Sequence, residues 1–248
     1  MSLGNIGTGE YHWFIGIVEN YDDPKHLGKV KIRIPHEHSD EVSTEELPWA
    51  TPMSPVTSAN LAGVGNTPVG LLPGSMVVGF YIDGKQKQKP VVMGSIPFIG
   101  QGKESLHSVS KYARGEKVNR VEYDFEPPSQ AKPEYPHNKV TQTFGGHVIE
   151  LDDTPGAERI HVYHRAGSYI EMNPDGSVVI RALGESFEVA VADKRIASIE
   201  GDILISSLTG EVTVTSGSSI NLQAEGSINI SSASGVVNIE APIIGLNA

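Results

Sequence analysis

Apolar positions in the last third of the chain recur as pairs separated by a single residue. Each pair follows a Gly and a short polar step, and the first members of successive pairs lie 9, 8, 8 and 9 residues apart. The pairs are Ile203/Ile205, Val212/Val214, Ile220/Leu222, Ile228/Ile230 and Val237/Ile239. Helical hairpins and propeller blades need about 30–50 residues per repeat. This shorter repeat has room for one strand and one turn, which is typical of a β-helix or β-solenoid rod.

The regular pairs predict a buried seam along this rod. Disorder, the alternative for a tract rich in Ser, Thr, Asn and Gln, does not need regularly placed Ile and Val residues. An isolated ribbon would expose its apolar face and leave strand edges unpaired. We therefore expect a homotrimer whose pairs meet on a central axis. A single-chain solenoid is the alternative, although coils of 8–9 residues are narrow to close alone.

The front of the chain shows a different pattern, that of a small β domain. Residues 30–35 alternate Val30, Ile32 and Ile34 with basic neighbours, which predicts one buried face and one face in water. Further strands are expected at residues 12–19, 76–83 and 90–94. About five short strands in some 90 residues indicate a small closed barrel.

Three zones follow from these patterns. Residues 1–100 are expected to form the barrel domain, and residues 101–138, polar and rich in Pro, an extended linker. Residues 139–248 are expected to form the rod. It should open with longer strands at 146–152, 158–164, 167–172 and 177–181, and shorten into the repeat after Gly201.

Composition narrows the function classes. The 248 residues carry a formal net charge of −11, which disfavours nucleic-acid binding, and the absence of Cys excludes disulfides and thiolate metal sites. No stretch resembles a signal peptide, and none approaches the roughly 18 apolar residues of a membrane span. From Ile196 to Ala248 there is no Lys or Arg, so the rod should be uniformly acidic.

Candidate catalytic and metal-binding chemistry is sparse. His36 and His38 could face one ion if they lay on a strand, but a solvated loop after Pro35 is the favoured interpretation. His161 and His164 should point to opposite faces of a strand. The carboxylates at 116–126 lie in a Pro-rich segment without a core to fix their separation, as glycoside hydrolysis requires. We expect no catalytic residue and no metal site.

Several motifs together resemble a known family, the central spikes of contractile injection tails, which include T4-type phage baseplate spikes and the VgrG proteins of type VI secretion. They are the runs at 23–33 (DPKHLGKVKIR), 47–50 (LPWA), 73–84 (PGSMVVGFYIDG), 145–153 (GGHVIELDD), 159–160 (RI) and 167–176 (GSYIEMNPDG). Their order and spacing cover nearly the whole chain. The resemblance implies an all-β fold, with an N-terminal OB-fold barrel followed by an intertwined trimeric β-helix, or β-prism, as the stem.

Two departures from the family bear on function. The linker is too short for the muramidase domain that T4-type spikes carry at that point, so we expect a structural protein and not an enzyme. Only about ten residues precede the barrel, whereas VgrG proteins carry a hub region there. This favours a phage spike that docks on a separate trimeric hub. A VgrG-like spike and a β-helical envelope-degrading enzyme remain the alternatives.

The resemblance also implies partners and a place of action. We expect the protein in the virion, at the tail baseplate, after assembly in the host cytoplasm, with the bacterial outer membrane as its target. The residues expected to contact the hub are Lys29, Lys31, Arg33 and Trp49. A solvated basic face is the alternative interpretation of the three cations.

The end of the chain supplies a last candidate site. Ile243, Ile244 and Leu246 could plug the core of the trimer, or remain exposed as a platform for a PAAR-type tip protein. Some spikes of this family hold iron at the tip through a His-x-His motif, but no His follows His164 here. No cofactor is expected, with an ion on the spike axis left open.

Overall fold

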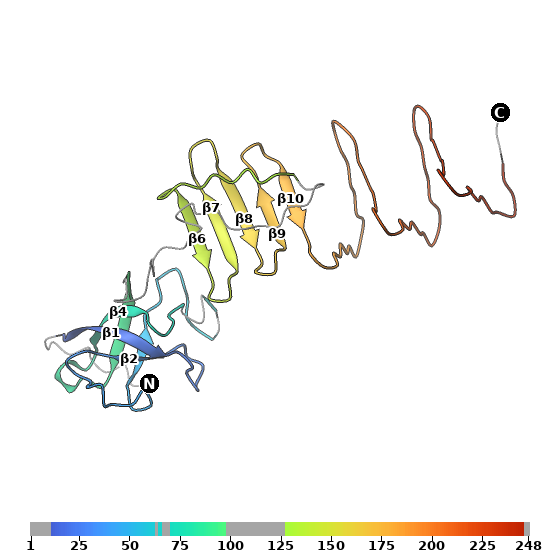
Figure 1. Cartoon of the computed structure of the whole chain (residues 1–248). Coiled ribbons are helices and arrows are strands. Elements are labelled where there is room, and N and C mark those ends of the chain that lie inside the picture. The colour runs from blue at the N-terminus through green and yellow to red at the C-terminus, as the bar shows by residue number, and fades with distance from the viewer. Residues whose placement is uncertain (1–10, 63, 66–69, 98–126, 246–248) are drawn as a thin grey trace. The chain divides into compact units, whose positions relative to one another are not determined.

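The computed structural model describes residues 11–62, 64–65, 70–97 and 127–245. The chain divides into two compact units, residues 1–187 and 188–248. The first unit contains a closed barrel and a separate five-stranded sheet (Figure 1). The second unit contains no strand or helix in its described part.

Five strands close the barrel in the order β1-β2-β3-β5-β4. They are β1 (Trp13–Asn20), β2 (Val30–Arg33), β3 (Trp49–Pro52), β4 (Met76–Tyr81) and β5 (Pro90–Ile96). All pairings are antiparallel except that between β3 and β5, which is parallel and closes the barrel. This is the topology of an OB-fold, and a short 3-10 helix, η1 (Gly84–Gln86), lies between β4 and β5.

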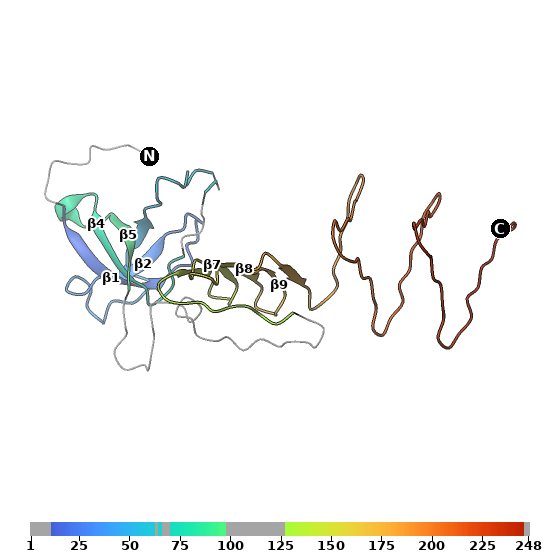
Figure 2. The same ribbon diagram turned by 90° about the horizontal axis from the view of Figure 1, so that it is seen from above.

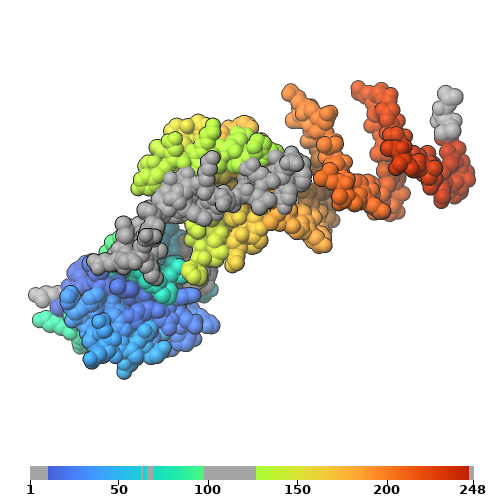
Figure 3. All heavy atoms as spheres, viewed as in Figure 1, coloured from blue at the N-terminus to red at the C-terminus, as the bar shows by residue number. Residues whose placement is uncertain are grey.

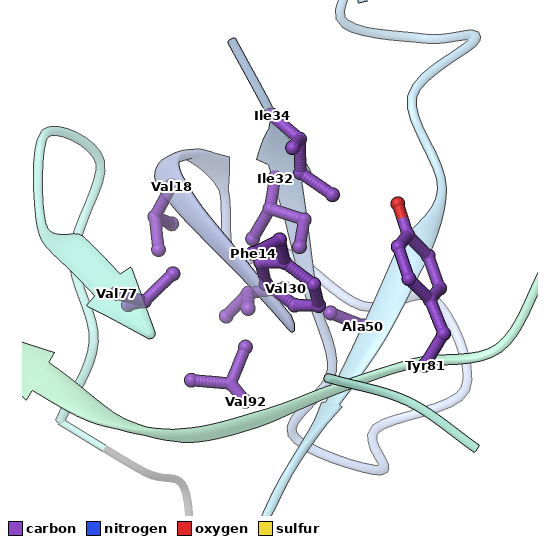
Figure 4. Packing of buried hydrophobic residues seen from close by; sticks show 9 residues of the cluster. All are labelled: Phe14, Val18, Val30, Ile32, Ile34, Ala50, Val77, Tyr81 and Val92. Atoms are coloured by element: carbon purple, nitrogen blue, oxygen red, sulfur yellow. The ribbon is translucent and has the colours of Figure 1, made fainter. Parts of the chain in front are cut away.

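The barrel core arises from the period-two alternation of its strands. On β1, Phe14 and Val18 point inward and are nearly inaccessible, and on β2 Val30 and Ile32 do the same. Their side chains converge with those of the other strands (Figure 4). The complete core cluster is Phe14, Val18, Val30, Ile32, Ile34, Ala50, Val77, Tyr81 and Val92.

The second sheet is an antiparallel meander in the order β10-β9-β8-β7-β6. Its strands are β6 (Asn138–Gln142), β7 (Val148–Asp152), β8 (Arg159–Tyr163), β9 (Tyr169–Met172) and β10 (Val178–Arg181). Figures 1 and 2 both show them side by side as successive rungs. Gly156 and Gly176 adopt positive φ in the predicted turns at 153–156 and 173–176.

The second unit is a polar chain that doubles back repeatedly without pairing with itself. In its described part every residue is exposed, and no backbone-to-backbone hydrogen bond forms. Ser side chains hold some of the turns, as where Gly210 and Gly235 donate from their amides to Ser207 and Ser232 at 3.1 and 3.0 Å. The space-filling view shows open space between successive passes (Figure 3).

The structure confirms the all-β class, the closed barrel and the strands expected in both sheets. Short strands were expected after Gly201, and none forms within a single chain there. The strand Trp49–Pro52 was not recognised by its periodicity, because four residues ending in Pro carry too little alternation. The linker expected at 101–138 falls largely outside the described residues, and its described end, 127–137, packs on the meander sheet.

Candidate self-assembly and docking surfaces

The meander sheet exposes its apolar face. Along β7, Ile149 is 53% exposed and Leu151 is 48% exposed, whereas Glu150 between them is 1% exposed. The same arrangement recurs in the pairs Ile160/Val162 on β8 and Ile170/Met172 on β9, which flank the buried His161 and Glu171. On β10 the exposed pair Val178/Ile180 flanks the half-buried Val179. A sheet of a soluble protein normally buries its apolar face and wets the polar one. The exposed apolar face of this sheet is therefore a candidate self-assembly surface.

In each apolar pair of the sheet the two residues are separated by a single residue. The pairs that were predicted to form the seam have the same spacing. The seam residues of the repeat are all 47% or more exposed: Ile203, Ile205, Val212, Val214, Ile220, Leu222, Ile228, Ile230, Val237 and Ile239. Apolar pairs with this spacing thus occur in the sheet from Ile149 onward as well as in the repeat from Ile203. We refer to all these pairs, from Ile149/Leu151 to Val237/Ile239, as the seam.

The opposite face of the sheet is polar and buried. Arg159 donates to Glu150 at 2.7 Å and to Glu171 at 2.8 Å, so that one guanidinium joins three strands. Asn138 donates its amide to Glu150 at 2.7 Å, and the His161 ring lies 3.3 Å from the other carboxylate oxygen. All five side chains are at most 8% exposed.

The hydrogen bonds and the positive charge in this network favour the ionised form of the buried Glu150 carboxyl. Burial alone raises the pKa of Glu150, but the His161 hydrogen bond, the Arg159 charge and the Asn138 amide outweigh it, and the pKa lies below its ordinary value. The carboxylate therefore stays ionised. Two carboxylates that share one guanidinium and are closed off from water form a structural ion network, since no substrate can reach them.

Residues 127–137, here called the strap, lie over this polar face. Gln130 donates to Asp175 in the β9–β10 turn at 2.7 Å, and the Ser129 hydroxyl lies 3.4 Å from Glu171. Further along, the Glu134 amide donates to the Thr154 hydroxyl at 2.9 Å, after which the chain enters β6. The strap thus crosses the sheet from β9–β10 to β6–β7, and it explains why polar side chains on this face are buried.

The basic residues proposed for hub contact are engaged within the barrel domain. Lys31 was expected to face water, but it is 5% exposed and donates to the carbonyls of Thr44 and Glu45, with its ammonium 5.2 Å from the Trp49 ring. Arg33 forms an ion pair with Glu19 and donates to the carbonyls of Ser39 and Val42. The expectation of a wet face was wrong for Lys31, because the loop at 39–46 folds over it. Lys29 and Trp49 are half-buried.

A different surface of the barrel is apolar and open. A pocket of about 400 Å³ is lined by Tyr11 and Trp13, by Thr51, Pro52 and Met53, and by Phe80, Ile82 and Val91. Trp13 and Phe80 meet with ring centroids 5.5 Å apart. Sequence reasoning missed this pocket, although the outward positions of β1, which include Trp13 and Ile15, carried the signal.

The remaining candidates acquire no new chemistry. His36 and Glu37 lie in an exposed turn, as expected, and Glu37 accepts from the Tyr81 hydroxyl and from Lys87, both at 2.5 Å. Among the described residues, no group of three or more His, Asp or Glu side chains could hold a metal ion. Ile243 and Ile244 are exposed, and Leu246 lies outside the described residues.

Comparison with known proteins agrees with this architecture. Residues 33–141 match the family model of the Gp5 N-terminal OB domain. The chain is 29% identical over 279 aligned positions to Protein Gp5 of Vibrio phage KVP40, an alignment that covers 84% of this chain and 66% of the relative. It is 33% identical over 96 positions to the pre-baseplate central spike protein Gp5 of Enterobacteria phage T4, covering 36% of this chain and 16% of that protein.

Residues 33–141 of the chain are similar to the OB domain of the T4-type Gp5 spikes.

The segment matched by the family model can be placed on the strands of the fold. It begins at Arg33, the last residue of β2, and ends at Thr141 in β6, so it contains three of the five barrel strands. The chain spans just under two thirds of the KVP40 protein and about a sixth of the T4 protein. In its described part, no helix is long and apolar enough to cross a membrane.

Proposed function

We propose that this protein is the structural spike of a contractile phage tail, a homotrimer that pierces the bacterial outer membrane by transmitting force. The observation that carries the proposal is the seam: apolar pairs are left exposed both in the sheet and in the repeat, and the described backbone of the repeat forms no hydrogen bond with itself. Burying one Val, Ile or Leu side chain contributes about 1.5–3 kcal/mol. A seam of this length is therefore a strong driving force for self-association.

Three copies satisfy the geometry better than two. Two sheets stacked face to face would cover the apolar pairs but would leave the backbone edges of the distal passes open. Three chains wound around one axis direct every pair inward and give each pass a neighbour from another chain on both sides. The open space between passes in Figure 3 is where those neighbours would lie.

Such a shaft suits mechanical work. Unravelling one chain would break hydrogen bonds to both others, so the trimer should be kinetically stable. The tract from Ile196 to Ala248 carries five carboxylates per chain and no Lys or Arg, so phosphate-rich envelope surfaces should repel it. The apolar end at Ile243 and Ile244 supports a PAAR-type tip partner, and the barrel supports docking on a trimeric hub. Assembly would take place in the host cytoplasm.

The protein is proposed to have no enzymatic activity of its own. A cluster of buried ionisable groups, Glu150, Arg159 and Glu171, forms an ion network that the strap covers. A purified full chain should release no reducing sugar from peptidoglycan. Release that is abolished by Glu150→Gln or Glu171→Gln would support an envelope-degrading enzyme in place of a purely mechanical spike.

Location distinguishes a phage spike from a bacterial secretion component. Antibodies against the full chain, gold-labelled and applied to purified virions, should bind at the baseplate end of the tail. Labelling of capsids alone, or absence of the chain from virions, would contradict the proposal and favour the VgrG-like alternative.

A further inference from the structure

The apolar pocket of the barrel is built by one row of side chains that crosses four strands. Trp13 on β1 pairs with Phe80 on β4, Phe80 with Val91 on β5, and Val91 with Thr51 on β3. Tyr11 adds a second aromatic contact, with its ring 5.6 Å from that of Phe80 in an edge-to-face arrangement. The row lies outside the barrel, because the neighbouring positions Phe14 and Val92 fill the core.

Several side chains in this row and beside it are exposed. The outward residues of β1 are open to solvent, Trp13 at 61% and Ile15 at 53%. Met53 beside the pocket and Met93 on β5 are also about half exposed. Contiguous exposed apolar surface of this kind marks a binding site in soluble proteins. Because the apolar surface continues past the pocket along β1, it is wider than a small ligand requires.

A basic hairpin adjoins the pocket. Ile82, which lines the pocket, donates its amide to the carbonyl of Lys89 at 3.1 Å, so the β4–β5 hairpin starts beside the pocket. The hairpin carries Lys85, Lys87 and Lys89, all exposed, and Lys87 pairs with Glu37. A basic hairpin next to an apolar pocket, on a chain of net charge −11, favours a partner with carboxylates next to its apolar contact.

We propose that this pocket is where the barrel binds a separate baseplate protein, through a segment with an aromatic or branched apolar side chain followed by acidic residues. The apolar side chain inserts between Trp13, Phe80 and Met53, and the carboxylates face Lys85 and Lys89. A buried aromatic anchor with a charged rim is the usual composition of a binding hot spot. A second copy of the chain is a poorer occupant, since the seam already accounts for self-association. The inference rests on the proposed function and replaces the basic strand as the expected docking surface.

The chain contains two Trp residues, which makes a matched experiment possible. Hydroxyl-radical footprinting with mass spectrometry would compare oxidation of Trp13 and Trp49 in the purified full-length trimer and in intact tails. We expect Trp13 to react readily in the free trimer and to be protected several-fold in tails, with Trp49 unchanged. Protection of Trp49 in place of Trp13 would overturn the inference, and so would protection of Trp13 already in the free trimer, because a second copy would then fill the pocket.

A second test measures how well variants of the pocket and hairpin are incorporated into tails. Trp13→Ala and Lys89→Glu should each leave the trimer intact and reduce incorporation into tails several-fold. The controls Tyr21→Ala and Lys25→Glu, also exposed but outside the pocket, should incorporate normally. A photo-crosslinker at position 13 should capture a peptide of another tail protein with an apolar residue and nearby carboxylates. Normal incorporation of Trp13→Ala would refute the pocket alone, whereas a monomeric wild-type chain would refute the spike itself.

Discussion

Ile149 and Glu150 are adjacent on β7 and have opposite environments: the apolar side chain is 53% exposed and the carboxylate is 1% exposed. The strap buries the polar face of the meander sheet, whereas no described residue of the same chain buries the apolar face. A buried polar face and an exposed apolar face are explained if the strap covers the outer face of each subunit and the Ile149 face lies inside the assembly.

Removing the cation of the buried ion network should be strongly destabilising. Arg159→Met would leave Glu150 and Glu171 buried without their shared partner, and breaking a buried pair in this way costs about 3–5 kcal/mol. Urea denaturation followed by circular dichroism would measure the loss. Lys139→Met is the matched control: its ion pair with Asp153 is exposed, and its removal should change stability little. Equal effects of both variants would contradict the structural role of the network.

Acid should weaken the attachment of the strap only at very low pH. The Ser177 side chain, then Gln130 and the Ser177 amide, lower the pKa of Asp175 from its ordinary 3.8 to about 2. Ionised Asp175 thus favours the folded state at any pH above 3.8, and this contribution is lost as the pH falls toward 2. The melting temperature should drop between pH 4 and pH 2, and less steeply in Asp175→Asn. A rise in melting temperature over this range would have the wrong sign.

Loss of the strap contacts should open one end of the sheet first. Ser129→Ala with Gln130→Ala removes the side-chain hydrogen bonds to Glu171 and Asp175 and leaves the Glu134–Thr154 bond in place. Hydrogen exchange should therefore accelerate at β9 and β10 and remain slow at β6 and β7. Uniform acceleration across all five strands would show that the strap does not act locally.

The barrel tolerates no side chain at one glycine and accepts one at another. A Cβ on Gly79 would lie 2.1 Å from the Val91 carbonyl oxygen and 2.6 Å from the Phe14 ring, whereas a Cβ on Gly94 would meet nothing within 4 Å. Gly79→Ala should destabilise the barrel by about 1–3 kcal/mol, as overpacking does. Gly94→Ala should be close to neutral. Thermal denaturation of the two variants would compare them directly.

The sequence was sufficient for elements with a clear period. The alternation of Val30, Ile32 and Ile34 predicted a barrel strand, and the apolar pairs predicted a seam, because both signals depend on local spacing. Lys31 and the strap could not be foreseen in this way. Lys31 is buried by a loop 13–14 residues away, and Glu171 is contacted by a segment that precedes its own sheet. Contacts of this kind join segments that are separated in the sequence, so they leave no periodic pattern from which they could be predicted.

The outward aromatic row of the barrel shows a further limit. Trp13 and Ile15 alternate with Phe14 and Gly16, and this alternation predicted a strand. Both faces of the strand carry apolar residues, so the alternation alone could not show which face is buried in the core and which is exposed. The inner residues form the core, and the outer residues Trp13 and Ile15 are exposed. Only the closed barrel distinguishes inside from outside.

The mass of the full chain in solution tests the central claim most directly. Native mass spectrometry and SDS electrophoresis without boiling should both give three copies of the 26.6 kDa chain. Ile228→Asp, which places a charge in the seam, should lower this mass or its resistance to SDS, and Asn229→Asp, one residue away, should not. A stable monomer of the wild-type chain, with its seam still exposed, would contradict the trimeric spike.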